Sequence, residues 1–154
     1  MHKLMKTLMM AAVLIMLASC LDDNRVYDHY EHISIEGWEH NDTLHFAIPP
    51  QREGTYNLCI GLRTTPAYPY QDICMVMEST INRTKTRKEK LKCHLMSPDG
   101  RIKGKNGVSS NEHLFFISIQ HLHDNDSLHI TLHHQMQDDM LQGITEVGIQ
   151  LKKT

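Results

Sequence analysis

Twelve histidines in 154 residues make metal binding the first chemistry to consider. On a strand, His121 and His123 would share one face with Cα atoms about 6.6 Å apart, so that two imidazoles could approach one zinc ion. His129 and His133 would be about 13 Å apart, too far for one ion. Because a catalytic zinc usually has three protein ligands and a structural one four, we interpret the histidines as an exposed polar face and predict no metal site.

The sequence also lacks the short motifs that accompany catalysis. It has no G-x-S-x-G, no H-E-x-x-H and no pattern around a cysteine that is typical of a thiol nucleophile. No spacing of the acidic residues singles out a pair for acid–base work. We therefore predict a protein that is not an enzyme and needs no cofactor. The formal net charge of −2 gives no basic excess, so nucleic acid is not an expected partner.

Cys20 is the residue best placed for covalent chemistry. It ends the sequence LASC at 17–20, directly after an apolar run at 8–18. That run is shorter than the roughly 20 residues needed to span a bilayer, and it fits the core of a secretory signal peptide. LASC resembles the lipobox of bacterial lipoproteins, in which the thiol receives a diacylglycerol group and the preceding peptide bond is cut. We predict lipidation of Cys20; the alternative is an ordinary secretory signal with a chance cysteine.

Three segments follow from this prediction. Residues 1–19 are a cleaved signal peptide, residues 20–31 are the lipidated N-terminus and a tether, and residues 32–154 are one folded domain. Acyl chains on Cys20 would hold the domain on a membrane without a spanning helix. Asp22 and Asp23 resemble the surface-export signal of some lipoproteins, or they only solvate the tether.

Apolar residues recur at every second position beyond the tether, as in half-buried strands. The alternating stretches are 44–48, 56–62, 73–77, 91–95, 115–119, 128–132 and 147–151. Turn-forming sequences separate them, such as PPQREG at 49–54 and SPDG at 97–100. We predict an all-β fold, a single antiparallel β-sandwich of jelly-roll or immunoglobulin-like type. The segment 134–143 could add one or two helical turns that end at Gly143.

Three cysteines remain if Cys20 carries lipid, namely Cys59, Cys74 and Cys93. Either two of them form a disulfide or all three are small buried hydrophobic residues. The second interpretation is slightly favoured.

Two loops are the best candidates for a contact surface. The loop TTPAYPYQD at 64–72 holds Tyr68 and Tyr70 around Pro69, and the Tyr68–Pro69 bond is a candidate for cis geometry. The loop is either a rigid connection whose rings cover the sandwich edge or a preformed aromatic surface, since tyrosine anchors interfaces well. The turn at 99–107 adds Asp99 and Lys105. These five residues are the predicted partner contacts.

Two further surface features have open interpretations. Asp-Thr-Leu at Thr43 and Asp-Ser-Leu at Ser127 resemble the O-glycosylation acceptor of exported proteins in one bacterial phylum, although an Asx turn before a strand also explains both. The basic run RTKTRKEKLK at 83–92 is typical of a hairpin tip or a protected edge strand. It could instead contact anionic headgroups or an acidic partner.

The order and spacing of several segments resemble the gliding-motility lipoprotein family GldH. They are DNRVYDHYEHI at 23–33, Trp38, LRTTPAYPYQDI at 62–73, SPDGRIKGKNG at 97–107 and LQGITEVGIQL at 141–151. None of them is a catalytic signature, so no active-site residue can be transferred. One departure is Ile102, where the family often has an aromatic residue.

The resemblance implies a lipid-anchored protein of the outer cell envelope, on a side of the outer membrane that the sequence leaves open. Its expected partners are the membrane and other envelope proteins of the motility machinery. We expect a docking or scaffold role without chemistry. The alternative function is a surface lipoprotein that binds a glycan or another ligand, with tyrosine or Trp38 stacking on it.

Overall fold

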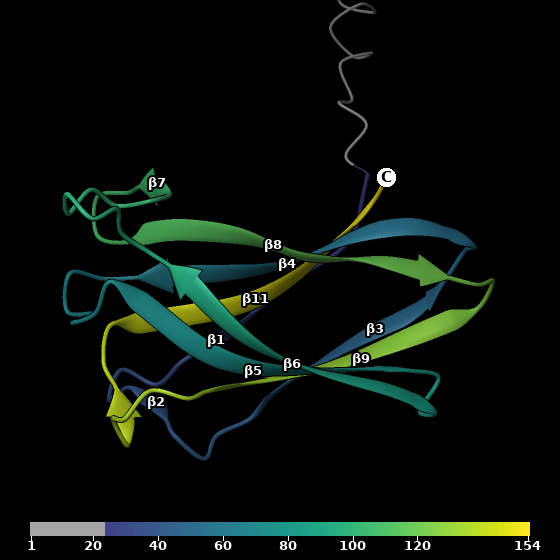
Figure 1. Cartoon of the computed structure of the whole chain (residues 1–154), viewed down its shortest axis with the longest axis horizontal. Helices are drawn as coiled ribbons and strands as arrows, with labels where there is room; N and C mark the ends of the chain where they lie inside the picture. The colour runs from purple at the N-terminus through teal and green to yellow at the C-terminus, as the bar shows by residue number, and fades with distance from the viewer. Residues whose placement is uncertain (1–23) are drawn as a thin grey trace, which may run out of the picture.

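The period-two alternation of apolar residues builds two layers of antiparallel strands, as predicted. The computed structural model describes residues 24–154, and Figure 1 shows the two layers stacked across one core. The strands are β1 (Arg25–His32), β2 (Trp38–Glu39), β3 (Leu44–Gln51), β4 (Gly54–Thr64), β5 (Asp72–Ile81), β6 (Lys85–His94), β7 (Lys105–Asn106), β8 (Asn111–Leu122), β9 (Asp126–His134), β10 (Met140–Leu141) and β11 (Ile144–Lys153). Among the described residues, no helix is long and apolar enough to cross a membrane.

The strand order identifies the type of sandwich. One sheet has the order β1-β11-β4-β8-β7 and the other β3-β9-β5-β6, while β2 and β10 form a small two-stranded sheet. Apart from the β5–β6 hairpin, consecutive long strands lie in different sheets, and the first strand, β1, pairs with the last, β11. This is the jelly-roll arrangement, one of the two types that the sequence predicted.

The core consists of the inward side chains of both sheets. Phe46, Ile60, Ile130 and Ile149 are all inaccessible to solvent, and each belongs to a stretch predicted from alternation. Trp38 is 1% exposed and donates its indole N–H to the carbonyl of Asp42 at 3.2 Å. Trp38 is thus a core residue.

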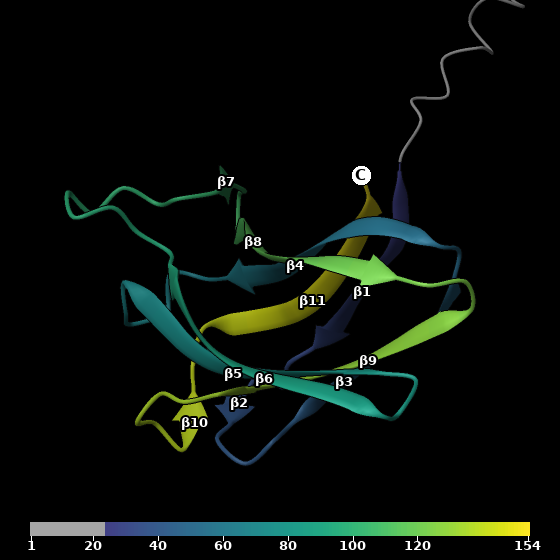
Figure 2. The same ribbon diagram turned by 45° about the vertical axis from the view of Figure 1, so that its right-hand side comes forward.

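The boundary predicted for the tether is wrong. Residues 25–31 were assigned to it, but Arg25–His32 forms β1 and pairs with β11. Pairing extends to the edge of the described chain, since Lys153 N–H donates to the carbonyl of Asn24 at 2.9 Å. The polar sequence of β1 misled the prediction because this edge strand has one solvated face and needs few apolar residues. Figure 2 shows β1 beginning beside the C-terminus and running toward β2.

The helical turns expected at 134–143 are also absent. His134 ends β9 with its Nε2 3.0 Å from the carbonyl of Trp38, which holds this segment beside β2. Met140 and Leu141 then pair with β2 as β10. Backbone pairing with β2 replaces the helical hydrogen bonds, and Gly143 makes a turn with φ of 81°.

The three cysteines of the domain are free thiols, so the favoured interpretation is confirmed in excluding a disulfide among them but holds for burial only at Cys93. Cys93 is buried, whereas Cys59 and Cys74 are half-buried.

The basic run at 83–92 forms the tip of the β5–β6 hairpin and the edge strand β6. Asn82 and Arg83 both have positive φ at that tip.

Candidate docking site

The loop between β4 and β5 places its two tyrosines differently. Tyr68 is 6% exposed, and its hydroxyl donates to the carbonyl of Asp72 at 2.7 Å. Burial raises the pKa of Tyr68 above the ordinary value for tyrosine. Tyr70 is exposed, and its hydroxyl donates to the carboxylate of Asp138 at 2.5 Å. Tyr68 therefore holds the loop in place, while Tyr70 and the exposed Pro69 are available to a partner.

The cis geometry expected for Tyr68–Pro69 is wrong, since no cis peptide bond occurs in residues 24–154. A hydrogen bond of 3.0 Å from Tyr68 N–H to the carbonyl of Thr65 already closes the turn before the proline. Gly143 lies against this turn, where a Cβ at residue 143 would be 2.2 Å from the Tyr68 nitrogen. The chain reverses through close backbone packing, with trans bonds throughout.

The predicted turn at 99–107 belongs to a longer excursion between β6 and β8. Gly100 N–H donates to the carbonyl of Ser97 at 2.9 Å, and Arg101 forms an ion pair of 2.6 Å with Asp99. The excursion then returns through a bridge between Met96 and Ile102. Asp99 and Lys105 are both exposed on it.

These two loops lie against each other at one end of the sandwich. Leu95 and Met96 both donate their N–H groups to the carbonyl of Gln71, at 2.8 and 3.2 Å. We call residues 64–72 and 95–107 together the loop end. Figure 1 shows the excursion rising beside the outer ends of β4 and β5. The predicted contact residues, distant in sequence, thus occupy one region of the surface.

A pocket of about 230 Å³ opens where the two loops meet. Pro66 and Tyr68 line it from one loop, and Met96 and Ile102 line it from the other. Its remaining lining residues are Thr64, Thr65, Leu95, Asn111 and His113. A mainly apolar pocket of this size can receive one side chain of a partner.

His113 fixes the wall of this pocket. It is 2% exposed, with Nδ1 2.5 Å from the carbonyl of Lys103 and Nε2 3.1 Å from the hydroxyl of Thr64. A carbonyl can only accept, so Nδ1 carries the proton and Nε2 accepts from Thr64. Burial lowers the pKa of His113, and the bond to Lys103 opposes this in part. The imidazole is therefore a neutral link between β8, β4 and the excursion.

A second feature is the outer face, which comprises the side chains of the five-stranded sheet that point away from the core. The strand register places them in four rows across β1, β11, β4 and β8. The rows contain Arg25, Lys152, Asn57 and Ile119; then Asp28, Gln150, Cys59 and Phe116; then Tyr30, Gly148, Gly61 and Leu114; then His32, Glu146, Arg63 and Glu112.

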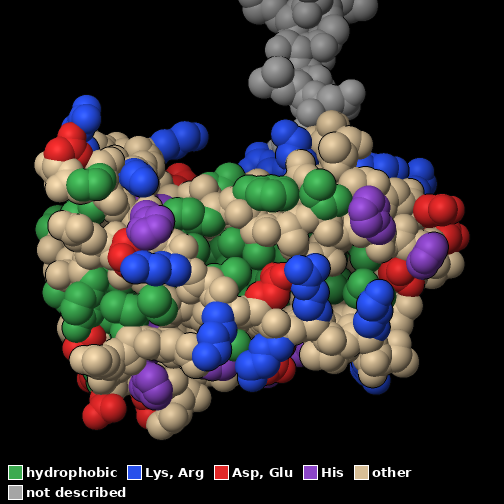
Figure 3. Space-filling model, in the orientation of Figure 1, with side chains coloured by type: hydrophobic (Ala, Val, Ile, Leu, Met, Phe, Trp, Pro, Cys, Tyr) green, Lys and Arg blue, Asp and Glu red, His purple; other side chains and the backbone are tan. Residues whose placement is uncertain are grey.

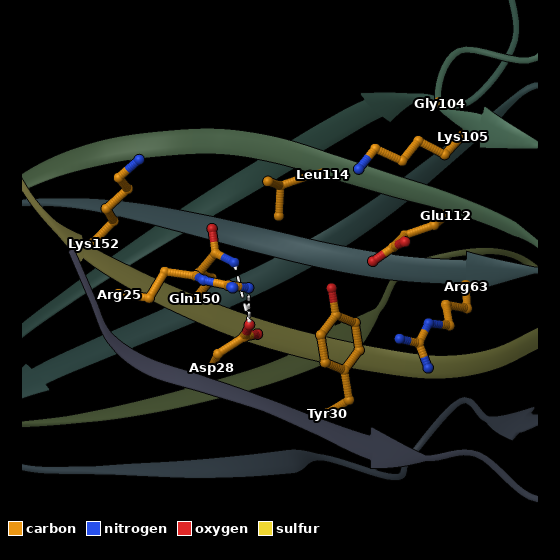
Figure 4. A pocket seen from close by; sticks show the side chains of 10 residues that line it. All are labelled: Arg25, Asp28, Tyr30, Arg63, Gly104, Lys105, Glu112, Leu114, Gln150 and Lys152. Atoms are coloured by element: carbon orange, nitrogen blue, oxygen red, sulfur yellow. Dashed lines mark hydrogen bonds and ion pairs between the residues drawn. The ribbon is translucent and has the colours of Figure 1, made fainter. Parts of the chain in front are cut away.

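A hollow of about 710 Å³ lies on this face. Tyr30 crosses its floor because Gly148 and Gly61 have no side chains there: a Cβ on either would lie 2.6 Å or less from the tyrosine. Arg63 has its guanidinium carbon 4.9 Å from the centre of the Tyr30 ring and forms an ion pair with Glu146. Figure 4 shows the Tyr30 hydroxyl directed into the hollow.

Sequence reasoning missed this hollow. Its signal was the pair of glycines inside β4 and β11, since glycine within a strand often marks a close approach of another group. Tyr30 lay in the segment that was taken for a tether. Desolvation of the ring raises the pKa of Tyr30, as do the carboxylates of Glu112, Asp28 and Glu146, while the Arg63 guanidinium opposes them.

The histidine pair considered for zinc does not gain further ligands. His121 is exposed, and its Nδ1 lies 3.3 Å from the hydroxyl of Thr55. Within residues 24–154, no three side chains of His, Cys, Asp or Glu are grouped to hold a metal ion.

Thr43 and Ser127 are both partly exposed, and Ser127 bonds to Asn82 through its N–H at 2.9 Å. Glycosylation of these two residues stays a prediction, as does lipidation of Cys20, which lies outside the described residues.

Comparison with known proteins decides the family. The model of the GldH lipoprotein family matches residues 25–151, which is almost the whole described domain. The chain belongs to the GldH lipoprotein family. The GldH match begins at Arg25, where β1 begins, so the family unit is the complete sandwich.

Two GldH relatives match over nearly their full length. The gliding motility lipoprotein GldH of Flavobacterium johnsoniae is 25% identical over 153 residues, covering 95% of this chain and 94% of the relative. A GldH homolog of Christiangramia forsetii is 24% identical over 150 residues, covering 92% of this chain and 91% of the relative. Both names describe a lipoprotein of gliding motility.

Two solved structures are similar to this chain at low sequence identity. A family GH115 4-O-methyl-alpha-glucuronidase has a TM-score of 0.43 at 12% identity, covering 86% of this chain and 18% of that chain. A family 35 carbohydrate binding module from Clostridium thermocellum has a TM-score of 0.36 at 11% identity, covering 77% of this chain and 76% of that chain.

Proposed function

We propose that this GldH-family protein is a non-catalytic docking component of the cell envelope, anchored through acyl chains on Cys20 in the outer membrane. The family supports the lipid anchor and the association with motility machinery. Five peptide steps separate Cys20 from Arg25, so the start of β1 lies at most about 18 Å from the anchored residue. Such confinement raises the effective concentration of envelope partners and favours weak docking.

The loop end is the proposed docking surface. The observation that carries this proposal is the convergence of the two loops around the pocket lined by Pro66, Tyr68, Met96 and Ile102. Tyr70 and Pro69 stand exposed on one loop, and Asp99 and Lys105 on the other. An apolar anchor side chain in the pocket, surrounded by these polar and aromatic groups, would resemble the centre and rim of a typical interface.

Site-specific photo-crosslinking in the host tests this surface. A photoreactive amino acid at position 70 should give a covalent adduct with an envelope protein. The same group at Thr86 should not give that adduct, because Thr86 lies about 27 Å along β6 from His94, the end of β6 that is beside the loop end. Ile102→Arg should abolish the adduct by placing a charge in the pocket. Val108→Arg is the matched control, because Val108 is fully exposed and outside the pocket. An adduct that survives Ile102→Arg would contradict docking through the pocket.

A second candidate function is binding of a glycan or another small polar ligand in the hollow. The observation that favours it is the Tyr30 hydroxyl, directed into a hollow that also contains Gln150 and Arg63. Trp38 cannot report such binding, since it is 1% exposed in the core. Amide NMR shifts on titration with sugars would report it: shifts at Tyr30 and Gln150 support this function, whereas an unchanged spectrum favours docking alone.

A further inference from the structure

The outer face has an apolar column on β8 that no other described residue covers. Leu114, Phe116 and Ile119 are 53%, 60% and 52% exposed. Only the first two residues of β8 pair with β7, so the rest of β8 is a free edge of the five-stranded sheet. Figure 3 shows green side chains over the upper layer, where Figure 1 places β8. Large apolar side chains exposed side by side indicate a contact surface.

Basic residues lie on the same half of the outer face. Lys152 shares the first row with Ile119, whereas the exposed Lys153 alternates to the other side of β11, as Leu151 does. Arg25 is also in that row and forms an ion pair of 2.7 Å with Asp28. The other two carboxylates of the outer face, Glu112 and Glu146, lie in the fourth row. That row is about 20 Å farther along the strands.

The described part of the chain also begins on this half of the outer face. Asn24 is hydrogen-bonded to Lys153, so the N-terminal segment leaves the domain directly beside the first row. We call the first two rows together with Leu114 the anchor-side half. If Cys20 carries acyl chains, the bilayer surface lies within about 18 Å of this half. The loop end is at the opposite end of the strands.

We infer that the anchor-side half of the outer face lies on the membrane surface. Phe116, Ile119 and Leu114 enter the boundary between headgroups and acyl chains, and Lys152 contacts anionic headgroups. The apolar contact, the contact with anionic headgroups and the acyl anchor together fix the orientation of the domain, with the loop end pointing away from the bilayer. This inference rests on the anchor in the proposed function and adds the surface that touches lipid.

Fluorescence quenching in vesicles tests it. The lipidated protein is purified from its host and placed in phosphatidylcholine vesicles that contain phosphatidylglycerol and nitroxide-labelled lipid. The indole introduced by Phe116→Trp, or by Ile119→Trp in a second variant, should lose about half of its emission or more, as expected at headgroup depth. Trp38 gives the same background in every variant, since it is buried.

The matched control is Ile35→Trp. Ile35 is 99% exposed in the connection after β1, about 25 Å along that strand from Arg25. Its indole should keep its emission in the same vesicles. Lys152→Glu should reduce quenching at position 116, whereas Lys90→Glu on β6 should not.

Three results would overturn the inference. A protein that floats with the vesicles but shows no quenching at positions 116 and 119 keeps its anchor, so only the orientation is wrong. A protein that does not float with vesicles lacks the anchor, and both the proposed anchoring and this inference then fail. Unquenched indoles together with crosslinked dimers through β8 would show that a second copy covers the column.

Discussion

Tyr30 lies flat on Gly148, its partner across the β1–β11 ladder, at a spacing that leaves no room for a side chain. The same ring extends over Gly61, which pairs with Gly148 from β4. One aromatic residue therefore covers two neighbouring glycines and ties the edge strand β1 to the middle of the sheet. Cover of this kind offsets the weak packing of glycine in strands.

Gly148→Ala should lower the free energy of unfolding by about 1–3 kcal/mol, because the new methyl group would overlap the Tyr30 ring. In a Tyr30→Ala background the same change should be nearly neutral or slightly stabilising, since alanine is more favourable than glycine in a strand. Urea denaturation of the four proteins measures this coupling. Equal effects in both backgrounds would show that the ring does not cause the strain.

Tyr68→Phe should destabilise the fold by about 1–2 kcal/mol, since the carbonyl of Asp72 loses its donor in a partly buried place. Tyr70→Phe should change stability little, because its bond to Asp138 is exposed. Thermal unfolding compares the two. A larger destabilisation by Tyr70→Phe would refute these assignments.

Acid should destabilise the domain through two buried histidines. His134 is inaccessible to solvent, its Nε2 donates to the carbonyl of Trp38, and its Nδ1 accepts from Met136 N–H at 3.3 Å. Burial lowers the pKa of His134 and of His113 below the ordinary 6.5. Between the lowered pKa and 6.5 the unfolded chain binds more protons than the folded one. This contribution to stability is therefore complete above pH 6.5 and is lost progressively as the pH falls below it.

Unfolding measured from pH 7.5 to 5 tests this sign. His113→Gln should flatten the curve, because the amide can replace the neutral imidazole as donor and acceptor without titrating. His121→Gln is the control on an exposed histidine of the same strand and should leave the slope unchanged. A stability that rises as the pH falls from 6.5 would contradict the neutral assignment of both buried imidazoles.

The thiols should differ in reactivity. Burial raises the pKa of Cys93 to about 11, so very little thiolate forms at pH 8, and this thiol should resist iodoacetamide in the folded protein. Cys59 is half-buried in the same row as Phe116. Phe116→Ala should therefore speed its alkylation, and site-resolved mass spectrometry after timed labelling gives both rates. Rapid labelling of Cys93 without unfolding would show that the β5–β6 edge opens readily.

The sequence predicted the strands whose inward side chains alternate strictly, such as β9 and residues 44–48 of β3, where every second residue is buried. It failed at β1, because an edge strand with Tyr30 over two glycines carries no apolar alternation. It failed at 134–143, because pairing with β2 depends on Trp38, almost a hundred residues earlier. The alternation of apolar residues along one segment does not reveal which distant strand that segment pairs with.

The candidate site was predictable in part. Tyr70, Asp99 and Lys105 were named as contacts and are exposed, while the burial of Tyr68 was missed. That the two loops meet follows from the β5–β6 hairpin: its tip is at 82–84, and Asp72 pairs with His94 at its open end. The chain on either side of a hairpin must lie together there. The pocket itself depends on how Ile102 folds back on Met96, which alternation does not encode.

The strand that closes the five-stranded sheet is the last strand of the described domain to be synthesised. β11 lies between β1 and β4, so β1 has no partner in the sheet, and β4 has only β8, until β11 has been made. Ladders between such distant parts of a chain form slowly. A nascent polypeptide of this kind should stay unfolded long enough to pass through a secretion channel, and a product truncated before β11 should be a substrate for proteases rather than a smaller version of the domain.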